Sequence, residues 1–392
     1  IATATVAFQA GAISEAQTAP KRGHGAEALQ VAVVANHNYV FDVVMGIQEA
    51  ASALALALEV LLFGYELGER FQLAGQNCKF LGGICKRHHR LNSLIYLISV
   101  ASDGRGEHHS NLVPDDAPEA SHEFTTAYHD NKPLSFSKVR GELELSWKEE
   151  PRLSKADLVV CGYPYPACYM LDEVPSAAST PVLLPIHGTV VTEYIDSRLH
   201  PWVRRTLLRW IGSSQRDSQS GPRLVVAMNH IEHFWFRRSL AAVPLVPLVC
   251  RYMRRFVAGD LGEDAPAVAN ARSSRVVLYR FRWGLPRLDA DVFERLAMRW
   301  VAMTRSPVKL VLESRDHGVW EMLNFRALVV VPWDWEITSF VEFYRLAIPL
   351  FMPRPEFMQA LIWHSLRQPE IRQQQRFIRF RRQWWEGAEC HV

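Results

Sequence analysis

Short runs of consecutive apolar residues, rich in Val and Leu, recur along the chain and alternate with segments of amphipathic helical pattern. Runs without polar alternation predict strands that are buried on both faces of a sheet. Because a helical segment follows each run, the pattern predicts an α/β fold with a parallel, doubly wound sheet. The strands predicted in the first half are residues 29–35, 59–63, 156–161, 181–185 and 223–227.

A polar stretch containing Gly, Pro and Ser at residues 259–274 interrupts this rhythm and predicts a linker. Strand and helix patterns then resume, so we predict two tandem Rossmann-like domains, residues 29–258 and 275–368. The strands predicted in the second domain are residues 275–279, 307–312, 326–331 and 348–352, and its helices are residues 290–304, 316–323 and 339–347.

Two segments depart from the rhythm. Residues 1–28 are Ala-rich, and we expect a disordered or processed N-terminal segment. Residues 71–150 combine many polar residues with little periodicity, which predicts a polar surface insertion in the first domain and disfavours a metal site. The insertion contains His88, His89, His108, His109, His122 and His129.

Composition narrows the class of protein. A length of 392 residues favours two domains, because single cores stop growing at about 250–300 residues. The 44 basic and 41 acidic residues leave a net charge of only +3, so we expect no nucleic-acid partner. The most apolar stretch, residues 50–63, is interrupted by Glu59 and is shorter than the ~20 residues of a membrane-spanning helix.

Six cysteines in a chain of this length are too few for a secretory disulfide framework. Two pairs of these cysteines each have six residues between them, which is wider than the usual ligand spacing of a zinc site. We therefore predict free, buried thiols in a reducing compartment and a cytoplasmic location.

Polar residues follow the predicted strands of the first domain, at the sheet edge where open α/β proteins bind ligands. They are Asn36, His37, Asn38, Asp42, Tyr163, Tyr165, His187, Gly188, Thr189, Asn229, His230, Glu232 and His233. We select Asn36, His187 and Asn229 as acceptor-side residues. A structural role in a tight turn is an alternative for His187. For Asn229 we favour a helix cap over a metal site, because the histidines beside it lack the spacing of a metal motif.

His37 is the candidate general base, with Asp42 or another carboxylate to orient the imidazole. Capping of the following helix is the alternative. In the second domain, Arg280 and Arg282 flank Phe281 at a strand end and share one face. Their planar guanidinium groups suit phosphate, although a solvated strand exit also explains them.

Residues 334–353 predict a strand end, a polar loop, a helix and a tight turn into a further strand. Thr338 and Ser339 fall where the helix begins, and free backbone N–H groups at such a position bind anions. Glu342 lies one turn inside the helix, where its carboxylate can accept hydrogen bonds from ligand hydroxyls.

This segment resembles the donor-site signature of GT-B-fold glycosyltransferases, which is an acid, seven residues, a glutamate and a helix leading to Gly-x-Pro. Asp334 and Glu342 have the seven-residue gap, and Pro349 follows at the family spacing. Asp334 replaces the usual glutamate, and Ala347 stands where glycine is usual.

The resemblance implies two Rossmann-like doubly wound domains that face a cleft, with the C-terminal helix, residues 369–392, crossing between them. It implies that Glu342 binds the ribose of a nucleotide-sugar and that Thr338 and Ser339 hold its diphosphate. Asp334 would approach the transferred sugar, and Arg280 or Arg282 would supply the basic contact.

The expected function is hexosyltransferase-like transfer from a nucleotide-sugar donor to a glycan, lipid or protein acceptor. We expect no cofactor or metal, because arginine and a helix N-terminus can stabilise the departing diphosphate. His37 serves as base if the reaction inverts, whereas Asp334 matters more if it retains configuration.

Three alternatives remain. The chain fits a non-catalytic GT-B-like binding or scaffold protein, and it also fits a sugar-phosphate epimerase of the same architecture. The basic, aromatic segment at residues 369–392 fits a peripheral contact with a membrane surface.

Overall fold

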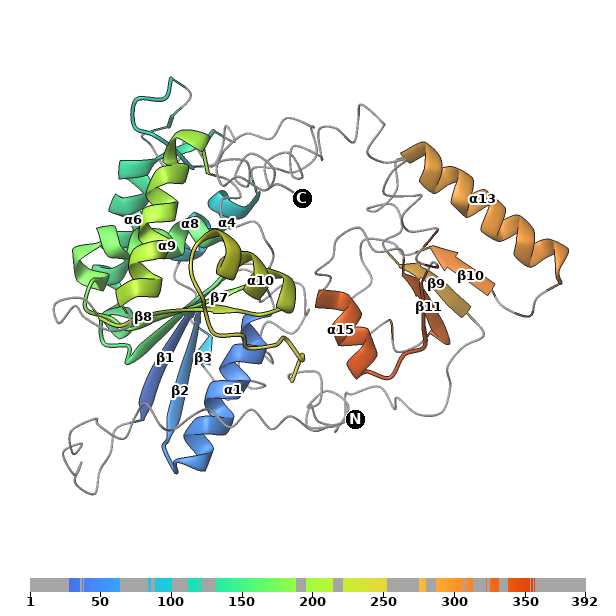
Figure 1. Ribbon diagram of the computed structural model, residues 1–392, viewed down its shortest axis with the longest axis horizontal. Helices are drawn as coiled ribbons and strands as arrows, with labels where there is room; N and C mark the ends of the chain where they lie inside the picture. Colours follow the sequence, from blue (N-terminus) through green and yellow to red (C-terminus); the bar gives the residue numbers. More distant parts are fainter. Residues whose placement is uncertain are drawn as a thin grey trace.

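The computed structural model (Figure 1) describes residues 28–63 except 36 and 38, 84–85, 89–100, 112–121 except 119, 132–187, 195–213, 221–251, 275–279, 287–312 except 306 and 308, 322, 325–330, and 338–356 except 353 and 355. The predictions for the N-terminal segment, the linker at 259–274 and the helix at 369–392 lie outside these residues, as does most of the helix predicted at 316–323.

The first sheet has five parallel strands and a two-residue sixth strand at its edge, in the order β3-β2-β1-β6-β7-β8. The order reverses between β1 and β6, whose last residues Val34 and Cys161 pair directly. The predicted parallel, doubly wound sheet is therefore confirmed. Its strands are β1 (Leu29–Val34), β2 (Leu58–Phe63), β3 (Ile84–Cys85), β6 (Leu158–Cys161), β7 (Val182–Ile186) and β8 (Arg223–Ala227).

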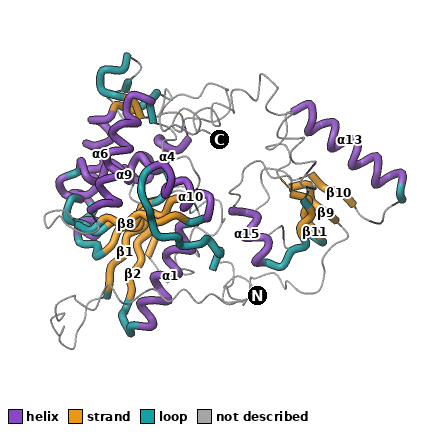
Figure 2. The backbone as a smooth tube through the Cα atoms, in the orientation of Figure 1, coloured by secondary structure: helices purple, strands orange, loops and turns teal. Residues whose placement is uncertain are grey.

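Helices cover both faces of this sheet (Figure 2). Alternate residues of β1 point to opposite faces: Ala32 and Val34 join one buried cluster, and Val31 and Val33 join the other. The first cluster includes residues of α4 (His89–Val100), α6 (Phe136–Glu149), α8 (Tyr165–Tyr169) and α9 (His200–Ser213), and the second includes α1 (Val40–Ala53). Smaller elements are α7 (Pro151–Ser154), α10 (His230–Ser239), the 3-10 turns η2 (Met170–Glu173), η3 (Pro175–Ala177) and η4 (Ser197–Leu199), and a short sheet of β4 (Leu112–Val113) and β5 (Leu134–Ser135).

The prediction of a surface insertion at residues 71–150 is wrong for the described parts of that range. Helices α4 and α6 lie there and contribute fully buried residues such as Leu94 and Trp147. The buried face of α6 also contains Glu142, whose carboxylate is held by Arg90 Nη1 at 2.7 Å and Lys138 Nζ at 2.8 Å. A buried charge of this kind interrupts the apolar stripe that marks a core helix in a sequence.

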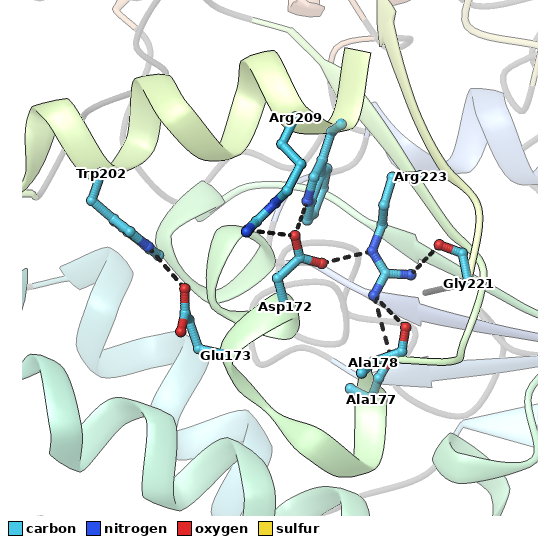
Figure 3. A network of polar contacts seen from close by, with 9 residues as sticks. Asp172, Glu173, Ala177, Ala178, Trp202, Arg209, Gly221 and Arg223 are labelled. Carbon is cyan, nitrogen blue, oxygen red and sulfur yellow. Dashed lines mark hydrogen bonds and ion pairs between the residues drawn. The ribbon is translucent and has the colours of Figure 1, made fainter. Parts of the chain in front are cut away.

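The amino edge of the first sheet carries a buried polar network (Figure 3). Arg223, the first residue of β8, is almost fully buried, and its Nε donates to Asp172 at 2.9 Å. Its remaining N–H groups donate to backbone carbonyl groups, and Arg209 Nη2 and Trp210 Nε1 of α9 donate to Asp172. The carbonyl acceptors of Arg223 belong to Ala177, Ala178, Thr180 and Gly221.

The second sheet is also parallel, in the order β10-β9-β11-β12. Residues of β11 and of the helix that precedes β12 belong to the same buried cluster as α1, and Arg345 Nε donates to Val249 O at 2.7 Å. The elements of this part are β9 (Arg275–Tyr279), α13 (Arg287–Met303), β10 (Lys309–Leu312), β11 (Ala327–Val330), α15 (Thr338–Arg345) and β12 (Leu350–Phe351). Within the part of the chain that the structure describes, no helix has the length and apolar character needed to cross a membrane.

Candidate functional site

The candidate site lies at the carboxyl edge of the first sheet, where the strand order reverses and ligands of open α/β sheets bind. His37 and Tyr39 follow β1, Tyr163 follows β6 and His187 follows β7. The ring centroid of His37 lies 5.1 Å from that of Tyr39, 6.3 Å from that of Tyr163 and 6.4 Å from that of His187. Side chains separated by up to 150 positions in sequence therefore gather around His37.

Two buried phenols hold the strand-end loops together. Tyr39 Oη accepts a hydrogen bond from Tyr163 N at 2.9 Å and has Tyr165 Oη and Pro185 O as acceptors for its own proton, each at 3.2 Å. Tyr165 Oη in turn donates to His187 O and accepts from His187 N, both at 2.8 Å. The backbone on both sides of the His187 side chain is thus fixed by Tyr165.

These phenols stay protonated. Burial raises the pKa of Tyr39, and it raises those of Tyr165 and Tyr169 well above the usual value of 10.0. The buried Glu232 carboxylate adds to the rise in the pKa values of Tyr39 and Tyr165. The phenols of Tyr39 and Tyr165 therefore remain hydrogen-bond donors throughout the physiological range of pH.

Gly162 allows the loops after β1 and β6 to approach each other. A Cβ atom at this position would lie 2.5 Å from Val40 Cγ1 and 3.0 Å from Tyr39 Oη. Real side chains almost never come this close, so only glycine lets the phenol of Tyr39 reach the backbone of Tyr163. Shortly after this glycine, the peptide bond between Tyr163 and Pro164 is cis.

A disulfide closes the same loop. Cys161, the last residue of β6, is bonded to Cys168 in α8, with the two Cα atoms 5.6 Å apart. The prediction of free thiols is therefore wrong for this pair, because the short turn between strand and helix brings two buried sulfurs together. Cys250 is a buried thiol, as predicted.

His37 is half-buried, and its Nδ1 accepts a hydrogen bond from Tyr39 N at 3.4 Å. In a neutral imidazole with Nδ1 as acceptor, the proton resides on Nε2. The bond is near the limit of hydrogen-bond length, so the other tautomer is within easy reach. His37 can therefore offer either a donor or, after this bond opens, a basic nitrogen at Nε2.

Asp42 has a different role from the predicted one of orienting His37. Its fully buried carboxylate accepts hydrogen bonds from Val249 N at 2.8 Å, from Arg251 N, and from Arg251 Nη1 at 3.3 Å. These bonds anchor residues 249–251 to α1 at its first turn. Because Val249 also accepts from Arg345, the anchored segment lies between α1 and α15.

Asn229 caps α10, as the cap interpretation predicted. Its Oδ1 accepts from Glu232 N at 2.8 Å, and Glu232 Oε2 accepts from Met228 N at 3.1 Å. This exchange satisfies backbone donors at the start of the helix. Among the described residues, no group of three His, Cys, Asp or Glu side chains is placed to hold a metal ion.

On the side predicted to bind the donor, α15 begins at Thr338, and Glu342 is buried one turn inside it. Helix α15 ends in a turn where Ala347 has a φ of 52° and Ile348 N donates to Phe343 O at 3.2 Å. The other predicted site residues, Asn36, Arg280, Arg282 and Asp334, lie outside the residues that the structure describes.

Sequence reasoning missed Tyr39. It precedes α1 and was indistinguishable from a core aromatic residue, because its partners at Tyr163, Tyr165 and Pro185 are 124 to 146 positions away. A tyrosine that closely follows a strand end and a histidine is the one local signal that marks it.

Searches with the sequence found no match among models of known protein families and none among curated proteins, so function is argued from the site itself.

Proposed function

We propose that the protein is a glycosyltransferase that moves a hexose from a nucleotide-sugar to an acceptor held at the carboxyl edge of the first sheet. The observation that carries the proposal is the half-buried imidazole of His37 at the switch point, inside a rigid frame of buried phenols. The second parallel sheet, with α15 after β11, supports the proposal of a donor site at that helix. The GT-B arrangement, with both sheets facing one cleft, is part of this proposal.

In the proposed reaction, His37 Nε2 takes the proton of the acceptor hydroxyl, and the hydroxyl oxygen attacks the anomeric carbon. The bond from that carbon to the diphosphate oxygen breaks, and its electron pair leaves with the nucleoside diphosphate. Backbone N–H groups at the start of α15, together with Arg280 or Arg282, stabilise the leaving group. Glu342 binds the ribose hydroxyls, and Asp334 contacts the transferred sugar.

The base role sets a condition on His37. Proton transfer to Nε2 requires the tautomer that carries its proton on Nδ1, so the long contact with Tyr39 N must open. The second imidazole of the site, that of His187, lies 6.4 Å away and has a buried Nδ1. We assign the base role to His37 and a positioning role to His187.

Titrating the purified protein with a panel of nucleotide-sugars by calorimetry tests the donor step, and turnover of the sugar that binds tests the transfer. His37→Ala should lower turnover about 10²- to 10⁴-fold, the usual contribution of a general base, with donor affinity unchanged. Glu342→Ala should instead weaken donor binding. His200→Ala is the matched control, since this histidine is half-buried like His37 but begins α9.

Failure of every nucleotide-sugar to bind would count against the enzyme and favour the scaffold alternative. Full turnover in His37→Ala with loss in His187→Ala would transfer the base role to His187. An equal loss in His200→Ala would show that the effect is not specific to the site.

A further inference from the structure

Helix α13 carries large apolar side chains on its solvent side. It contacts β10 and lies at the outer end of the second sheet, as Figure 1 shows in orange. Leu296 is 60% exposed, Trp300 62% and Met303 73%, values that are unusual for side chains of this size. The spacing i, i+4, i+7 places the three on one stripe of the helix.

The rest of the helix explains which way this stripe faces. Glu294, Ala297 and Val301 are half-buried and repeat at i, i+3, i+7, so they form the side that packs on the sheet. A rotation of 100° per residue puts Leu296, Trp300 and Met303 about 90–150° away from the mean direction of that side. The apolar stripe is therefore a second face of α13 and is not part of the domain core.

Cations flank the stripe. Arg295, Arg299, Arg305 and Lys309 are all exposed, and the acidic residues of α13, Asp289, Asp291 and Glu294, all precede the stripe. Arg295 and Arg299 are one turn apart and lie on the helix surface beside Leu296 and Met303. Apolar and cationic side chains thus share one exposed surface, which we call the α13 surface.

We propose that the α13 surface docks on an anionic lipid membrane, with Leu296, Trp300 and Met303 inserted at the headgroup boundary and the arginines against lipid phosphates. An interfacial helix combines an apolar stripe with flanking basic residues, and Trp favours that depth of the bilayer. The proposal concerns a different surface from the proposed active site and does not depend on its activity.

Other occupants fit these residues less well. A second copy packed across a two-fold axis at the middle of the stripe would bring Arg299 towards its own counterpart, away from the acidic residues near the start of α13. A nucleic acid would take the cations but leave the apolar stripe in water. A membrane surface with negative charge satisfies both kinds of side chain at once.

Co-sedimentation of the full chain with vesicles provides the test. We expect binding to phosphatidylcholine vesicles that contain phosphatidylserine, weaker binding to phosphatidylcholine alone, and weakening by salt. Arg295→Gln with Arg299→Gln should lower the partition coefficient about 25-fold, because each basic residue near an anionic surface contributes about fivefold. Leu296→Ser with Trp300→Ser should abolish binding to both kinds of vesicle.

Leu54→Ser is the matched control, because Leu54 is similarly exposed, at 69%, but follows α1 on the first domain. Its binding should equal that of the unmodified chain. Equal binding of the α13 variants and the unmodified chain would overturn the proposal, and loss on deletion of residues 370–392 alone would assign binding to the tail. A mass in solution that halves in the Leu296→Ser and Trp300→Ser variant, without vesicle binding, would assign the α13 surface to a second copy.

Discussion

The two edges of the first sheet both bury polar side chains but use them differently. At the amino edge, the guanidinium of Arg223 is enclosed by Asp172 (Figure 3) and by four backbone carbonyls, so its hydrogen-bonding capacity is directed inward. At the carboxyl edge, Tyr39 and Tyr165 also bond inward, to backbone groups, but His37 and His187 remain half-buried. The first network encloses the Arg223 guanidinium almost completely, whereas the second leaves two imidazoles partly exposed.

The largest effect is expected at the amino edge. Arg223→Met would leave the Asp172 carboxylate without its buried partner and would remove the donors of several carbonyls. Breaking a buried ion pair on one side costs about 3–5 kcal/mol, so the free energy of unfolding should fall by that amount. Chemical denaturation followed by circular dichroism measures it.

Arg209→Met is the matched control for this substitution. Arg209 bonds to the same carboxylate at 2.8 Å, but it is half exposed, so its loss should cost less than about 1 kcal/mol. Folded Arg223→Met protein should bind nucleotide-sugar as the unmodified chain does. Similar losses for both arginines would contradict the distinction between buried and exposed partners.

The same contrast explains what the sequence could predict. Strands such as β6 and β7 were predicted because they are unbroken apolar runs, a signal that each strand carries alone. Helix α6 was missed because Glu142 and Ser146 lie on its buried face, and their acceptability depends on partners elsewhere, Arg90 among them. Local periodicity reveals burial of apolar groups but not burial of paired charges.

The site was predictable to a similar degree. Strand ends identified His37, Tyr163, Tyr165 and His187, since the carboxyl ends of parallel strands must share an edge. The role of Tyr39 and the disulfide of Cys161 with Cys168 could not be inferred, because each depends on how loops fold over the edge. Asp42 was assigned to His37 by proximity in sequence, whereas its partners are 207 and 209 positions away.

A smaller effect is expected for the phenol that frames His187. Tyr165→Phe keeps the buried ring but leaves His187 N and His187 O without this partner. An orphaned buried group costs about 1–3 kcal/mol, so stability should fall in that range. Turnover should fall more than donor binding, because the position of His187 changes while α15 does not.

Tyr169→Phe is the control on the same helix. Tyr169 is fully buried and stacks on Tyr165 with ring centroids 6.4 Å apart, but its Oη has no hydrogen-bond partner among the described residues. Removing an unpartnered buried hydroxyl should leave stability unchanged or raise it. A loss in Tyr169→Phe as large as that in Tyr165→Phe would show that ring packing, and not hydrogen bonding, is being measured.

The smallest effect is expected where the second sheet departs from the resemblance. Ala347 follows α15 with a φ of 52°, a left-handed conformation that favours glycine, and Ile348 N bonds back to Phe343 O as in a Schellman turn. Ala347→Gly relieves the strain of this conformation but also adds entropy to the unfolded chain. Because the first effect is the larger, the free energy of unfolding should rise by about 0.5–1 kcal/mol. Ala297→Gly, in the interior of α13, should lower it by a similar amount because that backbone is helical. Thermal unfolding of both variants measures the difference, and a loss of stability in Ala347→Gly would refute the left-handed turn on which the helix end depends.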